Sequence, residues 1–96
     1  MRKITRESVN AFLNREKFNK SNMSVTLDQG NAYLRLFGNC IAGLAEDGTL
    51  SISTCGWNTP TTKERLNALP NVRVNTKAGQ LYLNGVAWDG NPTYVK

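Results

Sequence analysis

The stretch "TTKERLNALP" at residues 61–70 repeats, with changes, the stretch "TRESVNAFLN" at residues 5–14. When Thr5 is aligned with Thr62, the two stretches share a threonine, a glutamate, an asparagine and an alanine at equivalent places. Hydroxyl residues at the start and apolar residues at helical spacing predict a helix in each stretch. The chain is therefore expected to contain two helix-led units, and its fold follows from what comes after each helix.

The first predicted helix runs from about Thr5 to Lys17. Val9 and Phe12 have the spacing of one helical face, and Thr5 is a favoured residue for the N-cap. With that cap, Ile4 and Val9 occupy the two positions of a hydrophobic staple. This helix should bury its apolar stripe against a sheet.

The second predicted helix is shorter and covers residues 61–69. Thr61 followed by Glu64 has the pattern of a capping box, and Pro70 would end the helix. Leu66 lies on its apolar face. Replacement of Phe12 or Leu66 is expected to be costly because each should anchor its helix to the sheet.

Alternation of apolar and polar residues after each helix predicts antiparallel strands. The clearest segments are 24–27, 32–37, 49–53, 72–75 and 80–83, with further strands near 40–45 and 86–88. Asn84-Gly85 is a strong signal for a two-residue hairpin turn. The predicted order is αβββ(β)-αβββ.

This order predicts an α+β fold, an antiparallel sheet with two helices in a single domain spanning residues 1–96. Its halves would be approximately 1–57 and 58–96. One helix on three strands cannot bury both its own stripe and the sheet face, whereas two such units can share a core. The likeness of the halves fits either a true duplication or the general resemblance of helix-then-strand units.

The composition argues against several classes of function. The 96 residues include no histidine and two cysteines, which are too few for a disulfide scaffold or a zinc site. The most common general base is absent, and no carboxylate pair is evidently held on facing elements. We expect no catalytic residues, no metal and no cofactor, and therefore not an enzyme. No apolar run approaches the length of a membrane helix, so a cytosolic location is expected.

The hairpin around "EDG" at residues 46–48 decides how Cys40 and Cys55 lie. A two-residue turn would place the two cysteines opposite each other, where a disulfide is conceivable. A three-residue loop ending in Gly48 instead pairs Leu44 with Leu50 and leaves the thiols out of register. We favour the three-residue loop, and with it free thiols, because a reducing cytosol disfavours disulfides.

The most unusual stretch is "CGWNTPTTKERLN" at residues 55–67. It brings an aromatic residue, hydroxyls and basic residues to the start of the second helix, which are parts of an anion or nucleic-acid contact. Candidate binding residues here are Trp57, Asn58, Thr59, Thr61, Thr62, Lys63 and Arg65, joined by Arg6 and Lys17 of the first helix. The alternative is that Trp57, like Trp88, covers the core and that the threonines only cap the helix.

The net charge of +5 accompanies the two repeated stretches. Basic helix faces can attract an anionic partner, or they can simply keep a protein soluble. Both interpretations require Lys63 and Arg65 to be exposed.

Three segments, "TTKERLNALP", "GQLYLNGVAWDG" and "RESVNAFLN", resemble a family of small uncharacterised proteins of tailed bacteriophages. In that family a "GW" precedes "TTKERLNALP" and a tryptophan-containing "LNGxxWDG" pattern closes the chain. The resemblance covers nearly the whole sequence, and it implies a small accessory protein in the cytoplasm of an infected bacterium. It brings no site assignment.

Two functions follow as expectations. The first is stoichiometric binding, as a monomer or homodimer, that inhibits or redirects a host or defence protein. The alternative is a module that binds RNA or single-stranded DNA through its basic helix faces and Trp57. Measuring binding at several salt concentrations distinguishes the two functions, because phosphate contacts weaken steeply with ionic strength.

Overall fold

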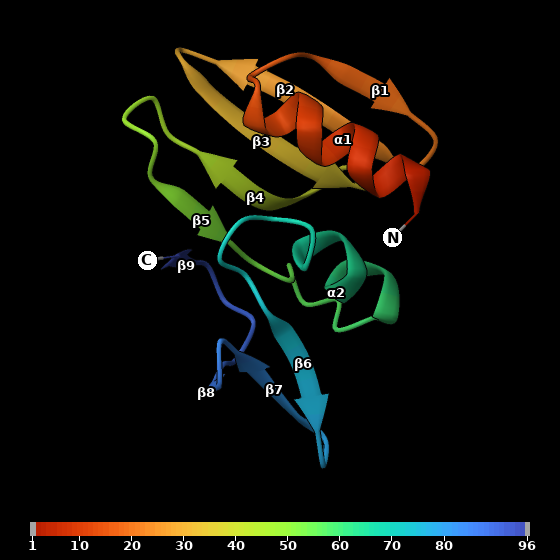
Figure 1. Cartoon of the computed structure of the whole chain (residues 1–96), viewed down its shortest axis with the longest axis vertical. Coiled ribbons are helices and arrows are strands. Elements are labelled where there is room, and N and C mark those ends of the chain that lie inside the picture. The colour runs from red at the N-terminus through yellow and green to blue at the C-terminus, as the bar shows by residue number, and fades with distance from the viewer. Residues whose placement is uncertain (1, 96) are drawn as a thin grey trace.

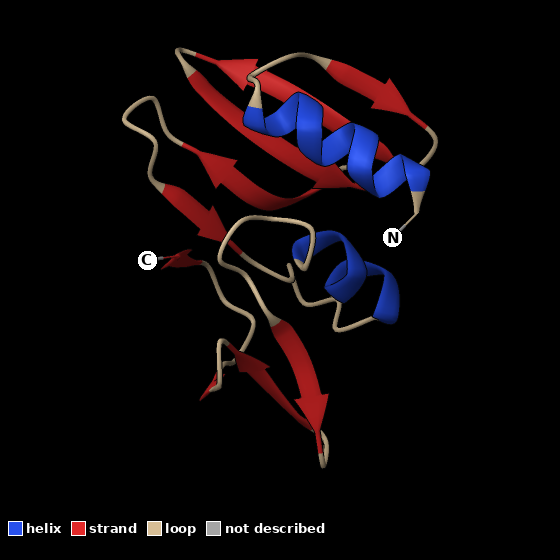
Figure 2. Ribbon diagram, viewed as in Figure 1, coloured by secondary structure: helices blue, strands red, loops and turns tan. Residues whose placement is uncertain are grey.

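The chain forms two helices and nine strands over residues 2–95, the part that the computed structural model describes. The helices are α1 (Lys3–Leu13) and α2 (Pro60–Leu66). The strands are β1 (Phe18–Lys20), β2 (Met23–Asp28), β3 (Asn31–Leu36), β4 (Asn39–Leu44), β5 (Leu50–Ile52), β6 (Val74–Lys77), β7 (Gln80–Leu83), β8 (Val86–Ala87) and β9 (Thr93–Val95). The predicted α+β class is confirmed (Figures 1 and 2).

The larger sheet is antiparallel and has the order β1-β2-β3-β4-β5-β9. Its register aligns Val25 with Leu34, Leu34 with Ala42, and Ala42 with Ile52, so that one buried apolar row crosses four strands. Helix α1 lies across this sheet (Figure 1). The period of two in each strand therefore builds the face against which the helix buries its stripe.

A second, three-stranded sheet has the order β6-β7-β8 and follows α2. In Figure 1 it extends away from the larger sheet, and the chain then returns so that β9 pairs with β5. Val74, Leu81 and Trp88 are buried in the same apolar cluster as Phe12 of α1. Both halves thus share one core, although the strands divide between two sheets where a single sheet was expected.

Four hairpins are closed by two-residue turns in which both residues have positive φ. The turns are Gln29-Gly30, Phe37-Gly38, Ala78-Gly79 and Asn84-Gly85. This conformation matches the right-handed twist of the flanking strands. The hairpin predicted at Asn84-Gly85 is confirmed, and the meanders β2-β3-β4 and β6-β7-β8 are built in the same way.

The predicted boundaries of the first helix were wrong at both ends. The helix begins at Lys3 with Arg2 as an N-cap that makes no side-chain hydrogen bond. Thr5 is not the cap, because its buried hydroxyl donates to Glu64 at 2.6 Å. The helix ends at Leu13, and Arg15 then adopts a φ of 53° instead of continuing toward Lys17.

The second helix also begins and ends earlier than predicted. Thr59 is its N-cap, Pro60 is its first residue, and Glu64 takes no part in a capping box with Thr61. The helix ends at Leu66 because the Asn67 side chain turns to strand β6, where it accepts from the Val74 N–H at 2.6 Å and donates to the Val74 carbonyl at 3.0 Å. These two bonds end the helix ahead of Pro70.

Two strands, β1 and β9, were not predicted. Each has three residues, and neither FNK nor TYV places two apolar residues at alternate positions, so no alternation marks them. They form the two edges of the larger sheet, where β1 is held by its pairing with β2 and β9 by its pairing with β5.

The hairpin between β4 and β5 confirms the favoured register. Leu44 pairs with Leu50, Ala42 pairs with Ile52, and both thiols are free. Within the described residues, neither helix is both long enough and apolar enough to cross a membrane.

Candidate binding pocket

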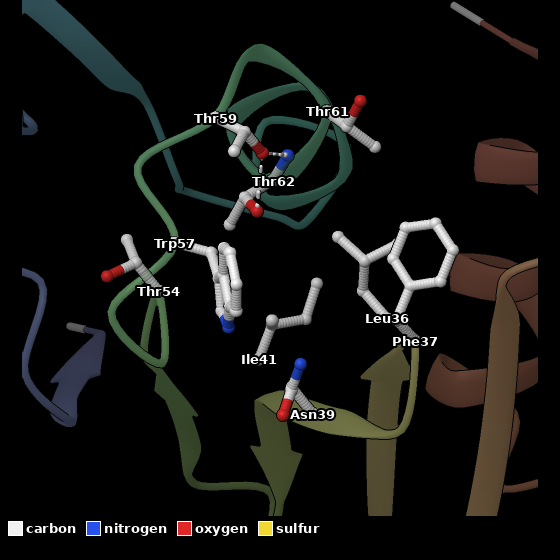
Figure 3. A pocket seen from close by; sticks show the side chains of 9 residues that line it. All are labelled: Leu36, Phe37, Asn39, Ile41, Thr54, Trp57, Thr59, Thr61 and Thr62. Atoms are coloured by element: carbon white, nitrogen blue, oxygen red, sulfur yellow. Dashed lines mark hydrogen bonds between the residues drawn. The ribbon is translucent and has the colours of Figure 1, made fainter.

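A pocket of about 370 Å³ opens between the β3–β4 turn and the start of α2. It is lined by Leu36, Phe37, Asn39, Ile41, Thr54, Trp57, Thr59, Thr61 and Thr62, all of which are uncharged (Figure 3). Trp57 stands on one side and Phe37 on the other (Figure 3). The predicted candidates Trp57, Thr59, Thr61 and Thr62 thus come together here.

The Trp57 wall is positioned by a tight turn. Cys55 and Gly56 have φ values of 54° and 82°, and the Trp57 N–H donates to the Thr54 carbonyl at 2.9 Å. This turn leaves the Trp57 side chain 59% exposed, so it does not cover the core. Trp88, in contrast, is buried as expected, and its Nε1 donates to the Asn91 carbonyl at 3.0 Å.

The Phe37 wall was missed by sequence reasoning. Phe37 is the first residue of the β3–β4 turn with a φ of 51°, a conformation that suits asparagine or glycine better than an aromatic residue. Its N–H donates to the Asn22 carbonyl at 2.8 Å, while its ring is 74% exposed. The dipeptide Phe37-Gly38 could have indicated a two-residue turn, but the predicted strand at residues 32–37 ended with Phe37.

The polar rim is formed by the first turn of α2. The Thr59 hydroxyl accepts from the Thr62 N–H at 3.2 Å and lies 3.1 Å from the Thr62 hydroxyl (Figure 3). Thr62 is buried, whereas Thr59 is exposed. Thr59 therefore caps the helix, and Thr59, Thr61 and Thr62 also line the pocket. The floor beneath them is made by Leu36 and Ile41, which are buried.

Arg65 is not part of this pocket, and its predicted exposure was wrong. Its side chain is 1% exposed. Through Nη1 it donates to the Thr5 hydroxyl at 2.7 Å and to the Glu64 carboxylate, and through Nη2 to Asn22 Oδ1 at 3.2 Å. Arg65 thus joins α2 to α1 and to the β1–β2 turn through its two terminal nitrogens, because a buried charge needs hydrogen-bond partners.

Glu64 is the counter-charge of this network. Burial raises the pKa of its carboxyl, but the hydrogen bonds from Thr5 and Arg65 and the charge of Arg65 outweigh it and hold the pKa below its usual value. Glu64 is therefore ionised at neutral pH. It completes an ion pair with the buried Arg65.

The remaining candidates lie elsewhere. The Lys63 amine donates to the Thr76 hydroxyl of β6 at 2.8 Å. Lys17 lies in the loop before β1, Arg6 is exposed on α1, and Asn58 is exposed beside Trp57 without lining the pocket. The predicted cluster of an aromatic residue with basic side chains is thus not assembled.

Within residues 2–95 no group of three His, Cys, Asp or Glu side chains gathers as a metal ion would require. The pocket itself offers apolar surface, hydroxyl groups and one amide. Its chemistry is that of recognition by shape and by neutral hydrogen bonds.

The fold and this pocket define a small α+β protein with an open apolar recess. The family model described as Kyanoviridae Gp96 protein matches residues 1–96, and the chain therefore belongs to this family of tailed-phage proteins. The predicted resemblance to a phage family is confirmed, while the specific motif stays a prediction. Neither the curated proteins nor the solved structures contained a significant match.

Proposed function

We propose that this phage protein is not an enzyme and acts in the cytoplasm of the infected bacterium by stoichiometric binding of a host or defence protein. The pocket between Trp57 and Phe37 is the proposed contact. The observation that carries this proposal is the exposure of two large aromatic side chains on either side of an uncharged recess.

The exposure of Phe37 has no evident benefit for folding. An aromatic residue at positive φ costs about 1–2 kcal/mol of backbone strain, and an exposed ring recovers little of this by burial. Asparagine at that position would suit the turn better. A strained, exposed aromatic residue beside an exposed tryptophan is typical of a surface that a partner covers.

The pocket also indicates what kind of group enters it. A volume of about 370 Å³ with a floor of Leu36 and Ile41 fits one or two apolar side chains. The Thr61 hydroxyl and the Asn39 amide are not buried and can bond to a backbone that passes over the rim. These features together favour an apolar segment of a polypeptide.

Nucleic acid is less well supported as the occupant. Phosphate contacts require accessible cations, but Arg65 is buried and Lys63 bonds to Thr76 on a different part of the surface. The nine side chains that line the pocket are uncharged. Base stacking on Trp57 would therefore lack nearby phosphate partners.

The test is capture of proteins from a lysate of the host bacterium on the immobilised protein. The parent is compared with Trp57→Ala and with Phe37→Asn, a change that suits the turn. Val86→Ala is the matched control, because Val86 is a 70% exposed apolar residue on β8, outside the pocket. Lysates are used with and without nuclease, and at low and high salt.

We expect the captured protein to be retained after nuclease and in high salt, and to bind each pocket variant at least about thirtyfold more weakly, the loss typical of a hot-spot residue. Val86→Ala should bind like the parent. Equal capture by the parent and both pocket variants would contradict the proposal. Capture that disappears with nuclease would assign the surface to nucleic acid.

A further inference from the structure

We propose that Cys40 and Cys55 form a reversible dithiol–disulfide site that closes the Trp57 pocket when it is oxidised. The proposal names the regulation of the site described above and rests on the proposed function for its biological meaning. The disulfide chemistry itself can be tested without a partner protein.

The Cys55 thiol lies against the backbone of Cys40 at the end of the β4–β5 hairpin, while the Cys40 thiol donates to the Ala42 carbonyl at 3.3 Å. The Cys55 thiol donates to the backbone carbonyl oxygen of Cys40, so its sulfur lies against the residue that it would join. Cys40 pairs with Arg35 on the face of the larger sheet opposite the buried row, and Cys55 is exposed. The predicted register leaves the two cysteines unpaired, but the turn at Cys55 brings its thiol back to the backbone of Cys40.

The position of each cysteine in the chain connects the pair to the pocket. Cys40 lies between Asn39 and Ile41, and both of these line the pocket. Cys55 lies in the turn that begins at Thr54 and ends at Trp57, which also line it. A bond between the two sulfurs would therefore tie the Trp57 wall to the strand that forms the floor.

The turn that carries Trp57 is strained at Cys55. Cys55 has a φ of 54°, which is unfavourable for a residue with a side chain, and the exposed Trp57 side chain adds little packing to hold it. Pulling Cys55 toward Cys40 draws Trp57 over the recess. The oxidised form should therefore have a smaller opening.

The oxidation is a balanced exchange with a small-molecule disulfide such as glutathione disulfide. The exposed Cys55 thiolate attacks one sulfur of that disulfide, forms a mixed disulfide and releases one glutathione thiolate. Cys40 reacts in the second step, because burial raises the pKa of its thiol and makes it the slower nucleophile. The Cys40 thiolate then attacks the Cys55 sulfur and releases the second glutathione. Two electrons pass to glutathione, and the two thiol protons end on its thiols.

The test begins with the full chain equilibrated in glutathione buffers of increasing oxidised fraction. Intact mass after alkylation measures the intramolecular disulfide, and non-reducing electrophoresis measures dimers. The controls are Cys40→Ser and Cys55→Ser, which keep a hydroxyl donor in place of each thiol. Anilinonaphthalene sulfonate serves as the pocket probe, and Trp57→Phe identifies the Trp57 part of the fluorescence.

We expect the parent to lose two hydrogens in mass, to regain them with a dithiol reductant, and to bind the dye about threefold or more weakly when oxidised. The serine variants should show neither change. A parent that forms only mixed disulfides or dimers would overturn the proposed site. A disulfide that forms without altering dye binding or Trp57 emission would overturn its coupling to the pocket. Failure of protein capture, in contrast, would refute the proposed function and leave the mass measurement unaffected.

Discussion

Replacing Arg65 by methionine tests whether the buried guanidinium holds the two helices together. Methionine fills much of the same volume and keeps the helix propensity of α2. The substitution removes the bonds to Thr5, Glu64 and Asn22 without adding a new polar group. The loss in free energy of unfolding therefore measures the contribution of those three contacts.

The expected loss can be estimated from the contacts. Hydrogen bonds from a charged donor contribute about 1.5–3 kcal/mol each, and three are lost. Two effects offset this: the buried Nε of Arg65 meets no acceptor among residues 2–95, so its desolvation cost disappears, and the Glu64 side chain is 31% exposed and can be solvated again. We expect a net loss of about 3 kcal/mol, the lower end for breaking a buried pair.

Urea unfolding followed by circular dichroism measures this loss. With a slope of about 1.5 kcal/mol per molar, the midpoint of Arg65→Met should fall by about 2 M. Arg6→Met is the matched control, because Arg6 is an exposed basic residue on α1 and should change stability by less than about 0.5 kcal/mol.

A loss below about 1 kcal/mol for Arg65→Met would refute the reasoning, because it would mean that desolvation cancels the network. A double-mutant cycle with Glu64→Gln supplies an independent check. The coupling energy of the two residues should be about 1–2 kcal/mol. Charge reversal by Arg65→Glu should unfold the chain, and it is therefore no test of nucleic-acid binding.

Three further predictions concern stability. Phe12→Ala and Leu66→Ala should each cost about 2–5 kcal/mol in urea unfolding, because both side chains are fully buried in the shared core; an unchanged midpoint would contradict that packing. Phe37→Asn should raise the free energy of unfolding by about 0.5–1 kcal/mol by relieving strain in the turn, and a loss of stability would show that the ring packs in the free protein. Because the pKa of Glu64 is lowered in the folded state, its contribution is present above the unfolded pKa and is lost as the pH falls through the folded pKa. The urea midpoint of the parent should therefore fall more steeply than that of Glu64→Gln below about pH 4.5, and parallel curves would contradict this.

The parts of the fold that could be predicted depend on local patterns. Alternating apolar residues set the main strands, and Asn84-Gly85 specified its hairpin because this pair adopts positive φ at little cost. The Leu44–Leu50 register followed from the need to keep apolar residues on one face. Each of these choices is decided within a few neighbouring residues.

The errors occurred where distant residues decide the outcome. Thr5 looks like a cap, but its hydroxyl is used by Glu64, which lies more than fifty positions away in the sequence. Arg65 looks like a surface residue until α1 supplies its acceptor. The candidate site was half predicted for the same reason: Trp57 and the threonines are neighbours in sequence, whereas the Phe37 wall comes from another hairpin.

The return of β9 to β5 has a consequence for the order of folding during synthesis. Until Thr93–Val95 emerge, β5 is an open edge of the larger sheet, with backbone groups available to any other strand. At roughly 5–20 residues per second, the segment between β5 and β9 takes about 2–8 seconds to make. The chain must protect that edge for this time, and a truncation before β9 would leave it permanently exposed. We therefore expect removal of residues 93–96 to increase aggregation in the cell more than it lowers the equilibrium stability of the remaining core.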